Sequence, residues 1–431
     1  MLPKDKLERL QWVCGYLKAP EWLFEELKGP KKVVKFKIRP IINGNRQTFE
    51  VIRVHYCNPH STGARPYKGG IRYHPDVTVE LMEVLGFDMT KKCALADLPF
   101  GGAKGGVIFN PTQHTPIGKR IITENMAQGL WANKVLGPDI DVPGPDVGTN
   151  SETMFWIYNK IGEWNGDFGL NIPNVAAIVT GKPIENDGCP GREDATARGG
   201  LIVLQEFLKL SDRLNGTITE KPRVIIQGFG NVGRNLAKLM PESQFNVIAV
   251  SDVRGGLYSS RGLNFDSISS YYDKYGTFCG FPEAEEISND TLLLIDCDIL
   301  IPAAIEDQIT AENADRIKAQ LVLELANEAV TACGYQLLKE RKIPVIPGIV
   351  ANTGGVVVSF IEWSNNRGLR PHKVDLEKNL ADVENRLDKI MKDLIRKTYK
   401  KSVENNLTID ETADVLAIET LRDQLKIKHG Y

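Results

Sequence analysis

The sequence is poor in cysteine and histidine, and neither residue type shows the spacing of a structural site. Its seven cysteines are dispersed along 431 residues, odd in number and never spaced CxxC. This pattern argues against a disulfide framework or a zinc knuckle, and it favours a reducing compartment. The six histidines show no HxxxH spacing, so we expect no metal site.

The chain also lacks an excess of charge of either sign and a long apolar run. Its 53 basic and 55 acidic residues leave a net charge of -2, which gives no general field for nucleic acid or a membrane surface. Asp296 and Asp298 interrupt the best candidate for a membrane span, and the N-terminal segment has no apolar core typical of a signal peptide. We therefore expect a cytoplasmic protein with no nucleic-acid and no membrane partner.

What remains is a composition typical of soluble globular proteins, with 42% hydrophobic and 25% charged residues. A chain of 431 residues is too long for one core, so two domains are expected. The stretch 181–200 is rich in Gly, Pro, Asn and Asp without a clear periodic element, which is typical of a boundary. We place the first domain at 1–182, with a C-terminal helix at 404–431 packing back on it, and the second at 183–403.

The first region predicts a partly antiparallel sheet with helices. Residues 33–38 and 48–57 read as strands, and Asn43-Gly44 between them is a turn signal, so a hairpin is expected. Helical patterns follow at about 79–95 and 118–136, separated by glycine-rich segments.

The second region predicts a doubly wound α/β sheet. Short uninterrupted apolar runs alternate with helical segments, as in buried parallel strands. The runs are 224–226, 247–250, 292–295, 299–301 and 321–325. From Asp375 to about 405 apolar residues recur at steps of four and three, which predicts an amphipathic helix whose charges form a solvated face. Thr408 and Glu411 form a capping box that predicts a last helix.

Three lysines in glycine-rich surroundings are the strongest functional signal. Lys68, Lys92 and Lys104 have glycine, proline and apolar neighbours, unlike ordinary surface lysines. Glycine permits close approach of the backbone to a ligand. A lysine in such a pocket either neutralises a carboxylate or, when desolvated, has a lowered pKa and acts as a base or nucleophile. The alternative, a solvated loop, leaves the Gly-Gly pairs after Lys68 and Lys104 unexplained.

A second motif indicates a dinucleotide. The strand predicted at 223–227 is followed at once by Gly228, Gly230 and Gly233 in GxGxxG spacing, with Asn231 and Val232 between them, and then by a helical pattern. The glycines allow a tight turn, approach of a pyrophosphate and close helix packing, and the helix N-terminus faces the phosphates. Asp252 ends the next strand and is placed to bind an adenosine ribose hydroxyl, which favours NAD. Arg254 could bind a 2′-phosphate, so NADP stays open.

Asp146 is a candidate for proton transfer. It lies between Pro145 and Val147 in a rigid polar turn at 141–150, and in isolation a turn former is the simpler interpretation. Beside a nicotinamide cofactor and three pocket lysines, a presented carboxylate suits removal of hydride from a carbon that bears a carboxylate and an amine.

From about residue 30 to the C-terminus the chain resembles the hexameric glutamate dehydrogenases of the Glu/Leu/Phe/Val dehydrogenase superfamily. The resemblance rests on a series of motifs in the family's order. They are KGGIR (68–72), LPFGGAKGG (98–106), DVPGPDVG (141–148), TGKP (180–183) with GREDAT (191–196), QGFGNVG (227–233) and ANTGGVVVS (351–359).

This resemblance implies an N-terminal α/β substrate-binding and oligomerisation domain with a mixed sheet, and a Rossmann-like NAD(P)-binding domain. It assigns the substrate side-chain carboxylate to Lys68 and Ser359, the α-carboxylate to Lys92, and the remaining pocket wall to Gly144 and Val356. Lys104, with a lowered pKa, and Asp146 match the catalytic pair. Thr196 and Asn352 match residues around the nicotinamide amide, and Asn327 matches one near its ribose.

The implied reaction is reversible oxidative deamination of L-glutamate to 2-oxoglutarate and ammonium by a likewise implied homohexamer. Because relatives acting on leucine, valine or phenylalanine carry apolar residues in place of Lys68 and Ser359, the pair points to glutamate. The alternatives are a dehydrogenase of a branched-chain or aromatic amino acid and a catalytically silent dinucleotide-binding homologue. Some positions depart from the family pattern: Gly144 replaces alanine, Ala197 replaces glycine, and Leu325 with 328–330 departs from the usual glycine- and proline-containing run near Asn327.

Overall fold

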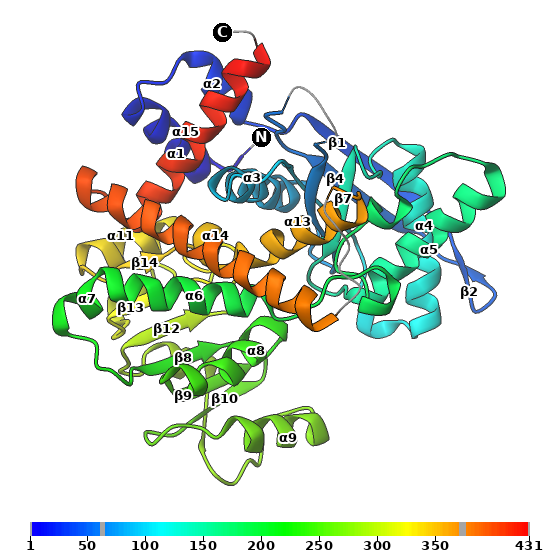
Figure 1. Ribbon diagram of the computed structural model, residues 1–431. Coiled ribbons are helices and arrows are strands. Elements are labelled where there is room, and N and C mark those ends of the chain that lie inside the picture. The colour runs from blue at the N-terminus through cyan, green and yellow to red at the C-terminus, as the bar shows by residue number, and fades with distance from the viewer. Residues whose placement is uncertain (1, 61–64, 370–375, 430–431) are drawn as a thin grey trace. The chain divides into compact units, whose positions relative to one another are not determined.

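The computed structural model describes residues 2–60, 65–369 and 376–429 (Figure 1). The chain divides into two compact units. The first comprises Met1–Arg192, Val356–Glu384 and Val415–Tyr431, and the second comprises Glu193–Gly355 and Asn385–Asp414. The sequence-based domain limits remain a prediction.

The first unit is built on a five-stranded mixed sheet in the order β1-β4-β6-β5-β7. Its strands are β1 (Lys32–Ile38), β4 (Phe49–His55), β5 (Tyr67–Tyr73), β6 (Gly101–Val107) and β7 (Asp141–Pro145). β1 and β4 are antiparallel, as are β4 and β6, whereas β5 is parallel to both β6 and β7. The predicted hairpin is confirmed, because β1 and β4 pair as antiparallel strands and the turn at Asn43-Gly44 between them joins the short strands β2 (Ile41–Ile42) and β3 (Asn45–Arg46).

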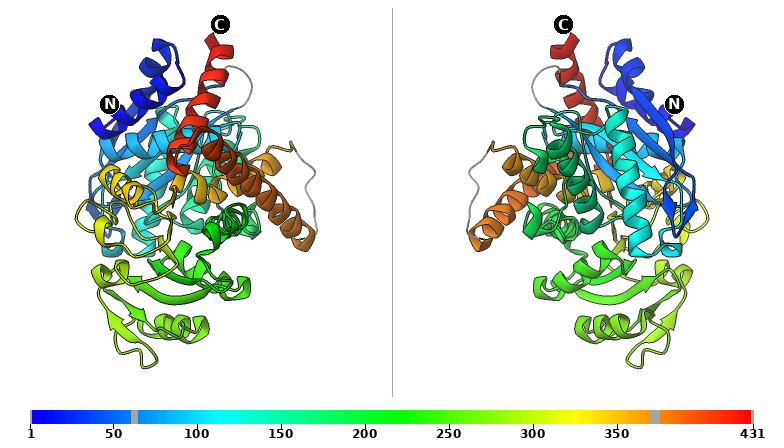
Figure 2. Two further views of the ribbon diagram at one scale, coloured as in Figure 1. Left: turned by 90° about the vertical axis from the view of Figure 1, so that its left-hand side faces the viewer. Right: turned by 90° about the vertical axis from the view of Figure 1, so that its right-hand side faces the viewer.

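Helices cover both faces of this sheet (Figure 2). On one face α3 (Val79–Leu95) packs against β6 so closely that a Cβ on Gly102 would lie 2.1 Å from Thr90 Oγ1. On the other face α4 (Pro116–Ala132) and α5 (Ser151–Phe168) enclose a core that includes Ile71, Met126 and Ile157. α1 (Lys4–Tyr16) and α2 (Glu21–Leu27) precede the sheet in the chain. The helix predicted at 79–95 is confirmed, and Thr78 caps it by accepting a hydrogen bond from the Leu81 N–H.

The second unit contains a seven-stranded sheet in the order β11-β10-β9-β8-β12-β13-β14. Five strands are parallel: β8 (Arg223–Gln227), β9 (Asn246–Asp252), β12 (Ile299–Pro302), β13 (Leu321–Leu323) and β14 (Val345–Ile346). β10 (Gly255–Tyr258) and β11 (Glu285–Ile287) add an antiparallel edge. This is the doubly wound α/β sheet that the sequence predicts.

The helices of this unit connect and cover these strands. They are α6 (Ala195–Leu210), α7 (Asp212–Gly216), α8 (Asn231–Leu239), α9 (Phe265–Tyr275), α10 (Asn289–Leu293), α11 (Ala332–Glu340) and α12 (Gly348–Ala351).

Two sequence-based predictions for this unit are wrong. The run at 292–295 is not a strand, because Ser288 caps the Thr291 N–H and starts α10, which buries Leu292 and Leu293. The stretch 181–200 is not free of elements, because α6 begins at Ala195.

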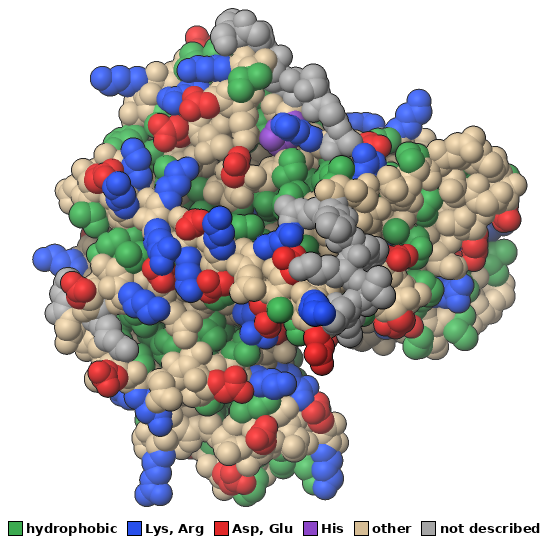
Figure 3. Space-filling model, viewed as in Figure 1, with side chains coloured by type: hydrophobic (Ala, Val, Ile, Leu, Met, Phe, Trp, Pro, Cys, Tyr) green, Lys and Arg blue, Asp and Glu red, His purple; other side chains and the backbone are tan. Residues whose placement is uncertain are grey.

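Three helices complete the chain: α13 (Gly354–Asn366), α14 (Leu376–Asn405) and α15 (Ile409–His429). α14 confirms the predicted amphipathic helix, although Asp375 lies outside the described residues. Leu387 and Met391 are buried, while the charged side chains of the helix are largely exposed and mix both signs (Figure 3). The predicted capping box is present, since Thr408 N–H donates to Glu411 Oε2 and Glu411 N–H donates to Thr408 Oγ1. Among the described residues, no helix is long and apolar enough to cross a membrane.

Candidate active site

The lysine-rich motifs converge on one face of the first unit's sheet. Lys68 on β5 pairs with Gly102 on β6 and with Val142 on β7. Because successive residues of a strand point to opposite faces, even-numbered residues of these three strands share one face. Lys68, Arg72 and Lys104 are therefore neighbours on the face that α3 covers.

Glycines on this face make room for the charged side chains. A Cβ on Gly70 would lie 2.7 Å from Asp146 Cβ, which is closer than real Cβ contacts allow. A Cβ on Gly144 would lie 3.0 Å from Lys68 Nζ and 3.3 Å from Thr180 Oγ1. Because Gly70 and Gly144 have no side chains, the space beside Asp146 and Lys68 stays open.

Asp146 follows β7 directly and is held by two cations. Lys104 Nζ donates to Asp146 Oδ1 at 2.7 Å, and Arg72 Nε donates to Oδ2 at 2.8 Å. Only 12% of the Asp146 side chain is exposed. Burial opposes ionisation of this carboxyl, but Lys104 and Arg72 outweigh burial and hold its pKa well below the usual range. Asp146 is therefore a carboxylate at neutral pH.

The turn that carries Asp146 is fixed by its neighbours. Thr149 Oγ1 accepts from the Asp146 N–H at 2.8 Å and lies 2.9 Å from the Ile71 carbonyl oxygen on β5. Gly148 has φ +75°, and a Cβ there would lie 2.2 Å from the Tyr73 carbonyl oxygen. Asn150 then forms a capping box with Thr153 and starts α5. The carboxylate is therefore presented by a rigid turn between a strand and a helix.

A second polar cluster surrounds Lys68. Ser359 on α13 is buried, its hydroxyl lies 3.2 Å from Thr180 Oγ1, and it accepts from Arg192 Nε at 3.2 Å. Lys68 is 3% exposed, and burial, reinforced by the charges of Arg192 and Arg53, lowers its pKa to about 7. A buried group of cations and hydroxyls of this kind is suited to a carboxylate.

Lys92 and Val356 lie on helices of the same unit. Lys92 is in the last turn of α3 and is buried. Val356 is buried on α13, one helical turn before Ser359, so the two residues share a helix face.

A buried ionic network supports β5 and β7 from the opposite face. Arg53 Nε donates to Asp141 Oδ2 at 2.7 Å, and His55 Nε2 lies 2.6 Å from the same oxygen. Arg53 Nη1 also donates to the Gly70 carbonyl at 3.0 Å. Although burial raises the pKa of Asp141, Arg53 and His55 lower it to about 2. This network fixes the glycine segment of β5 that lies beside Asp146.

The second unit contains the predicted dinucleotide motif in the predicted setting. β8 leads into Gly228, which has φ +102°, and α8 begins at Asn231 with Gly230 as its N-cap. A Cβ on Gly233 would lie 1.9 Å from the Gly228 carbonyl oxygen, whereas a Cβ on Gly230 would meet no atom within 4 Å. Gly233 is thus required for packing, and Gly230 borders open space at the start of a helix, where a pyrophosphate can approach. Val232 lies between them in the first turn of α8.

Asn352 and Asn327 lie together in this unit. Asn352 Nδ2 donates to Asn327 Oδ1 and to the Leu325 carbonyl, both at 3.1 Å. Asn352 Oδ1 is buried and has no hydrogen-bond partner among the described residues. A carboxamide N–H is a fitting donor for this orphaned oxygen, so the residues present fit a nicotinamide group. Thr196 lies in the first turn of α6, near Asn231, whose amide donates to the Glu193 carbonyl at 3.0 Å.

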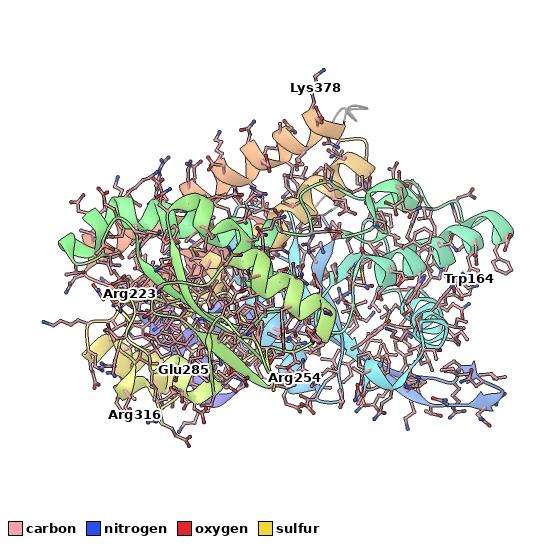
Figure 4. The ribbon with its side chains drawn as sticks, turned by 90° about the horizontal axis from the view of Figure 1, so that it is seen from below. Trp164, Arg223, Arg254, Glu285, Arg316 and Lys378 are labelled. Carbon is pink, nitrogen blue, oxygen red and sulfur yellow. The ribbon has the colours of Figure 1, made fainter. Side chains whose placement is uncertain are left out.

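Asp252 ends β9 and is paired with Arg254, which follows that strand (Figure 4). Arg254 Nη2 donates to Asp252 Oδ2 at 3.1 Å, and Tyr272 Oη donates to the same oxygen at 3.2 Å. Asp252 is thus held at the strand end where a Rossmann-like sheet binds the adenosine ribose.

Both parts of the chain match one family. Residues 30–163 match the family model described as "Glu/Leu/Phe/Val dehydrogenase, dimerisation domain", and residues 188–428 match "Glutamate/Leucine/Phenylalanine/Valine dehydrogenase". This protein belongs to the Glu/Leu/Phe/Val dehydrogenase family.

Individual members of the family agree over most of the chain. A cryptic catabolic NAD-specific glutamate dehydrogenase of Bacillus subtilis is 37% identical, with 91% of this chain and 87% of that one covered. An NADP-specific glutamate dehydrogenase of Synechocystis is 33% identical, with coverages of 98% and 96%. The solved hetero-hexameric glutamate dehydrogenase of Thermus thermophilus, in a leucine-bound form, has a TM-score of 0.87 at 26% identity and covers 99% of this chain and 98% of its own.

Three residues at which this Glu/Leu/Phe/Val dehydrogenase departs from the family pattern have defined surroundings or backbone conformations in the structure. Leu325 packs against α6, where a Cβ on Gly200 would lie 2.5 Å from Leu325 Cδ2. Glu328 adopts φ +53°, a left-handed conformation that glycine adopts more readily. Ala197 is buried within α6.

Sequence reasoning missed several residues of this dehydrogenase's site. They are Arg72, Thr149, Thr180, Lys182, Arg192 and Glu362. The first three and Arg192 contact Asp146 or Ser359, whereas Lys182 and Glu362 pair with each other beside Thr180. Four of them stand inside the quoted motifs KGGIR, TGKP and GREDAT, so their presence in those motifs was the available signal. Thr149 directly follows the motif DVPGPDVG, Glu362 lies three residues after ANTGGVVVS, and neither carried a signal of its own.

Proposed function

We propose that this protein is a glutamate dehydrogenase, which interconverts L-glutamate with 2-oxoglutarate and ammonium using NAD(P). The observation that carries the proposal is the polar cluster formed by the buried Lys68 and Ser359 with the half-buried Arg192. A dicarboxylic substrate supplies a carboxylate for this cluster, whereas an apolar side chain would leave its two cations with only the Glu362 carboxylate nearby, which Lys182 already pairs with. Leaving a buried charge without its partner costs about 3–5 kcal/mol. The same cost argues against a branched-chain or aromatic amino acid as the substrate.

In this proposal each pocket residue has a separate task. Lys68, Ser359 and Arg192 bind the side-chain carboxylate, and Lys92 binds the α-carboxylate. Val356 and Gly144 form the wall between these two positions. Thr196, Asn327 and Asn352 hold the nicotinamide end of the cofactor, while the turn at Gly228–Gly233 and Asp252 hold its pyrophosphate and adenosine.

Lys104 and Asp146 handle the protons. Bound NAD(P) supplies hydride transfer to or from the substrate Cα. Lys104 activates the attacking water, and Asp146 accepts protons from the amine and returns them to it. The 2.7 Å contact couples the two groups: when Lys104 is neutral, Asp146 loses its nearer cation and the pKa of its carboxyl rises. The pair can thereby pass a proton on, although the free site keeps Asp146 ionised. Retention of both groups argues against a silent homologue.

The decisive experiment is an initial-rate assay of 2-oxoglutarate plus ammonium with NADH and, separately, with NADPH. We expect turnover with 2-oxoglutarate and little with the 2-oxo acids of leucine, valine and phenylalanine. A preference for an apolar 2-oxo acid would contradict the assigned substrate. Absence of turnover with every 2-oxo acid would support the silent homologue.

Substrate binding should depend on pH through Lys68. The charged form binds a carboxylate, and it prevails below the free-site pKa of about 7. As pH rises above that value the free site loses its charge, so we expect KM for 2-oxoglutarate to rise up to about tenfold per pH unit until the pKa of the bound state is reached. A KM profile between pH 6 and 9 measures this slope. A flat profile would contradict a lowered Lys68 pKa.

Cofactor preference should respond to Asp252 and Arg254. A hydrogen bond from a ribose hydroxyl to a charged group contributes about 1.5–3 kcal/mol, so Asp252→Ser should weaken NADH binding about ten- to a hundredfold. The same change removes a negative charge from the position of a 2′-phosphate, so NADPH should lose less. Arg254→Ala should weaken NADPH more than NADH. Fluorescence titration of both cofactors measures these ratios, and equal losses for the two cofactors would contradict the assignment.

We further propose a cytoplasmic homohexamer. The dispersed cysteines favour a reducing compartment, and the structure records no disulfide among the described residues. The match of residues 30–163 to a domain described as a dimerisation domain supports self-association. Mass measurement of the native protein in solution tests the hexamer.

A further inference from the structure

A fully buried ion pair lies behind the side-chain carboxylate cluster and belongs to none of the roles assigned above. Lys182 Nζ donates to Glu362 Oε1 at 2.7 Å, and both side chains are 0% exposed. Lys182 belongs to the TGKP segment and Glu362 to α13. Burying such a pair costs desolvation free energy, so we infer that it has a function other than stabilising the fold.

The segment Val179–Lys182 is wrapped around the Glu362 carboxylate. The Gly181 N–H donates to Glu362 Oε2 at 2.7 Å, and Lys182 Nζ also donates to the Val179 carbonyl at 3.0 Å. Gly181 has φ +86°, and a Cβ there would lie 2.6 Å from Pro145 Cδ. The segment is therefore fixed on one side by Glu362 and on the other by the strand that leads to Asp146.

This arrangement determines where two hydroxyls lie. Thr180, between Val179 and Gly181, donates its N–H to the Pro143 carbonyl at 2.9 Å, and its hydroxyl lies 3.2 Å from Ser359 Oγ. Ser359 is three residues before Glu362, so both lie on one face of α13. Contacts of Glu362 with the segment thus set the distance between Thr180 and Ser359.

We propose that Glu362 and Lys182 are positioning residues that hold Thr180, Ser359 and α13 in the geometry needed to bind the side-chain carboxylate of the substrate. The inference rests on the proposed function. Glu362 acts on this subsite in a second way, through its charge. Burial, Arg192 and Arg53 lower the pKa of Lys68, while Glu362 and Cys93 raise it, so Glu362 helps to keep Lys68 charged.

The primary test is Glu362→Gln, assayed beside Glu163→Gln. Glu163 is a matched control, because it pairs with Lys160 on the exposed surface of α5 in the same unit. For Glu362→Gln we expect KM for 2-oxoglutarate to rise about ten- to a hundredfold, since small misplacements of binding groups have effects of this size. KM for ammonium and kcat should change little. The pH above which KM rises should move to lower values, because a charge that raises the pKa of Lys68 is gone.

A second pair of variants keeps the inference testable if Glu362→Gln fails to fold. Thr180→Val preserves the shape of the side chain but removes its hydroxyl, while Thr180→Ser preserves the hydroxyl. If the Thr180 hydroxyl is held in place for substrate binding, KM for 2-oxoglutarate should rise in Thr180→Val and stay near normal in Thr180→Ser. Hydrogen exchange in a peptide spanning 176–185 reports independently whether Glu362→Gln releases the segment.

The outcomes separate the two proposals. The positioning role would be overturned if the folded Glu362→Gln variant had a wild-type KM and a wild-type pH profile. If Glu362→Gln does not fold, the same results in Thr180→Val would overturn it. Lower thermal stability with an unchanged KM would overturn it too, because it would show a purely structural pair. If the wild-type protein does not turn over 2-oxoglutarate at all, the proposed function fails, and this inference fails with it.

Discussion

We expect Lys104→Met and Asp146→Asn each to lower kcat for glutamate oxidation by about 10²- to 10⁴-fold, the usual contribution of general acid–base catalysis. Each change removes one member of the pair joined at 2.7 Å, so the remaining group can no longer pass its proton on. The double variant should be little worse than either single variant, because the two residues act as a unit. Steady-state kinetics of the three variants measure the effect.

The control for these variants is Lys160→Met, which removes a half-buried lysine of α5 in the same unit that pairs with Glu163. It should retain wild-type kcat. NADH binding should also be retained in the Lys104 and Asp146 variants, since the dinucleotide motif belongs to the other compact unit. Near-normal turnover by Lys104→Met or Asp146→Asn would show that the chemistry is assigned to the wrong residues.

The second large effect is expected for Lys68→Leu. The substrate carboxylate would enter a buried site without its lysine, a loss of about 3–5 kcal/mol that corresponds to roughly 10²- to 10³-fold or more in kcat/KM for glutamate. Arg192 keeps part of the attraction, so binding should not vanish. Activity towards leucine should rise, and it should rise further when Ser359→Val is added.

Gly144→Ala is the matched control for Lys68→Leu. A Cβ at position 144 would lie 3.0 Å from Lys68 Nζ, so it displaces the tip of the lysine by a few tenths of an ångström but leaves its charge in place. We expect a much smaller change in kcat/KM than for Lys68→Leu. Unchanged glutamate kinetics in Lys68→Leu would refute the specificity argument.

Local signals in the sequence were sufficient for much of the fold. The helical pattern at about 79–95, bounded by glycine-rich segments, matches α3, and the structure adds the cap at Thr78 that fixes its start. The strand–glycine–helix order around Gly228 predicted the dinucleotide motif for the same reason, since each part is specified by adjacent residues. The run at 292–295 was misread because a short buried apolar run fits a strand and a helix equally, and only the cap at Ser288 distinguishes them.

The partners of the site residues were beyond the reach of sequence reasoning. Arg72 meets Asp146 across 74 residues of chain, Arg192 meets Ser359 across 167, and Lys182 meets Glu362 across 180. No periodicity or cap links such positions; sheet register and helix packing alone bring them together. Sequence motifs indicated the roles of the residues, whereas the fold was needed to show the contacts that set their positions and pKa values.

The glycines on the lysine-bearing face of the first sheet limit how this pocket can be redesigned. At Gly70 and Gly102 any side chain would collide with Asp146 or with α3, so the floor of the pocket cannot vary. New substrate ranges must instead be sought on α13 and in the segment around Thr180 and Arg192, where side chains already line the cluster. A library confined to those two segments should therefore yield folded variants far more often than one spread over the strands.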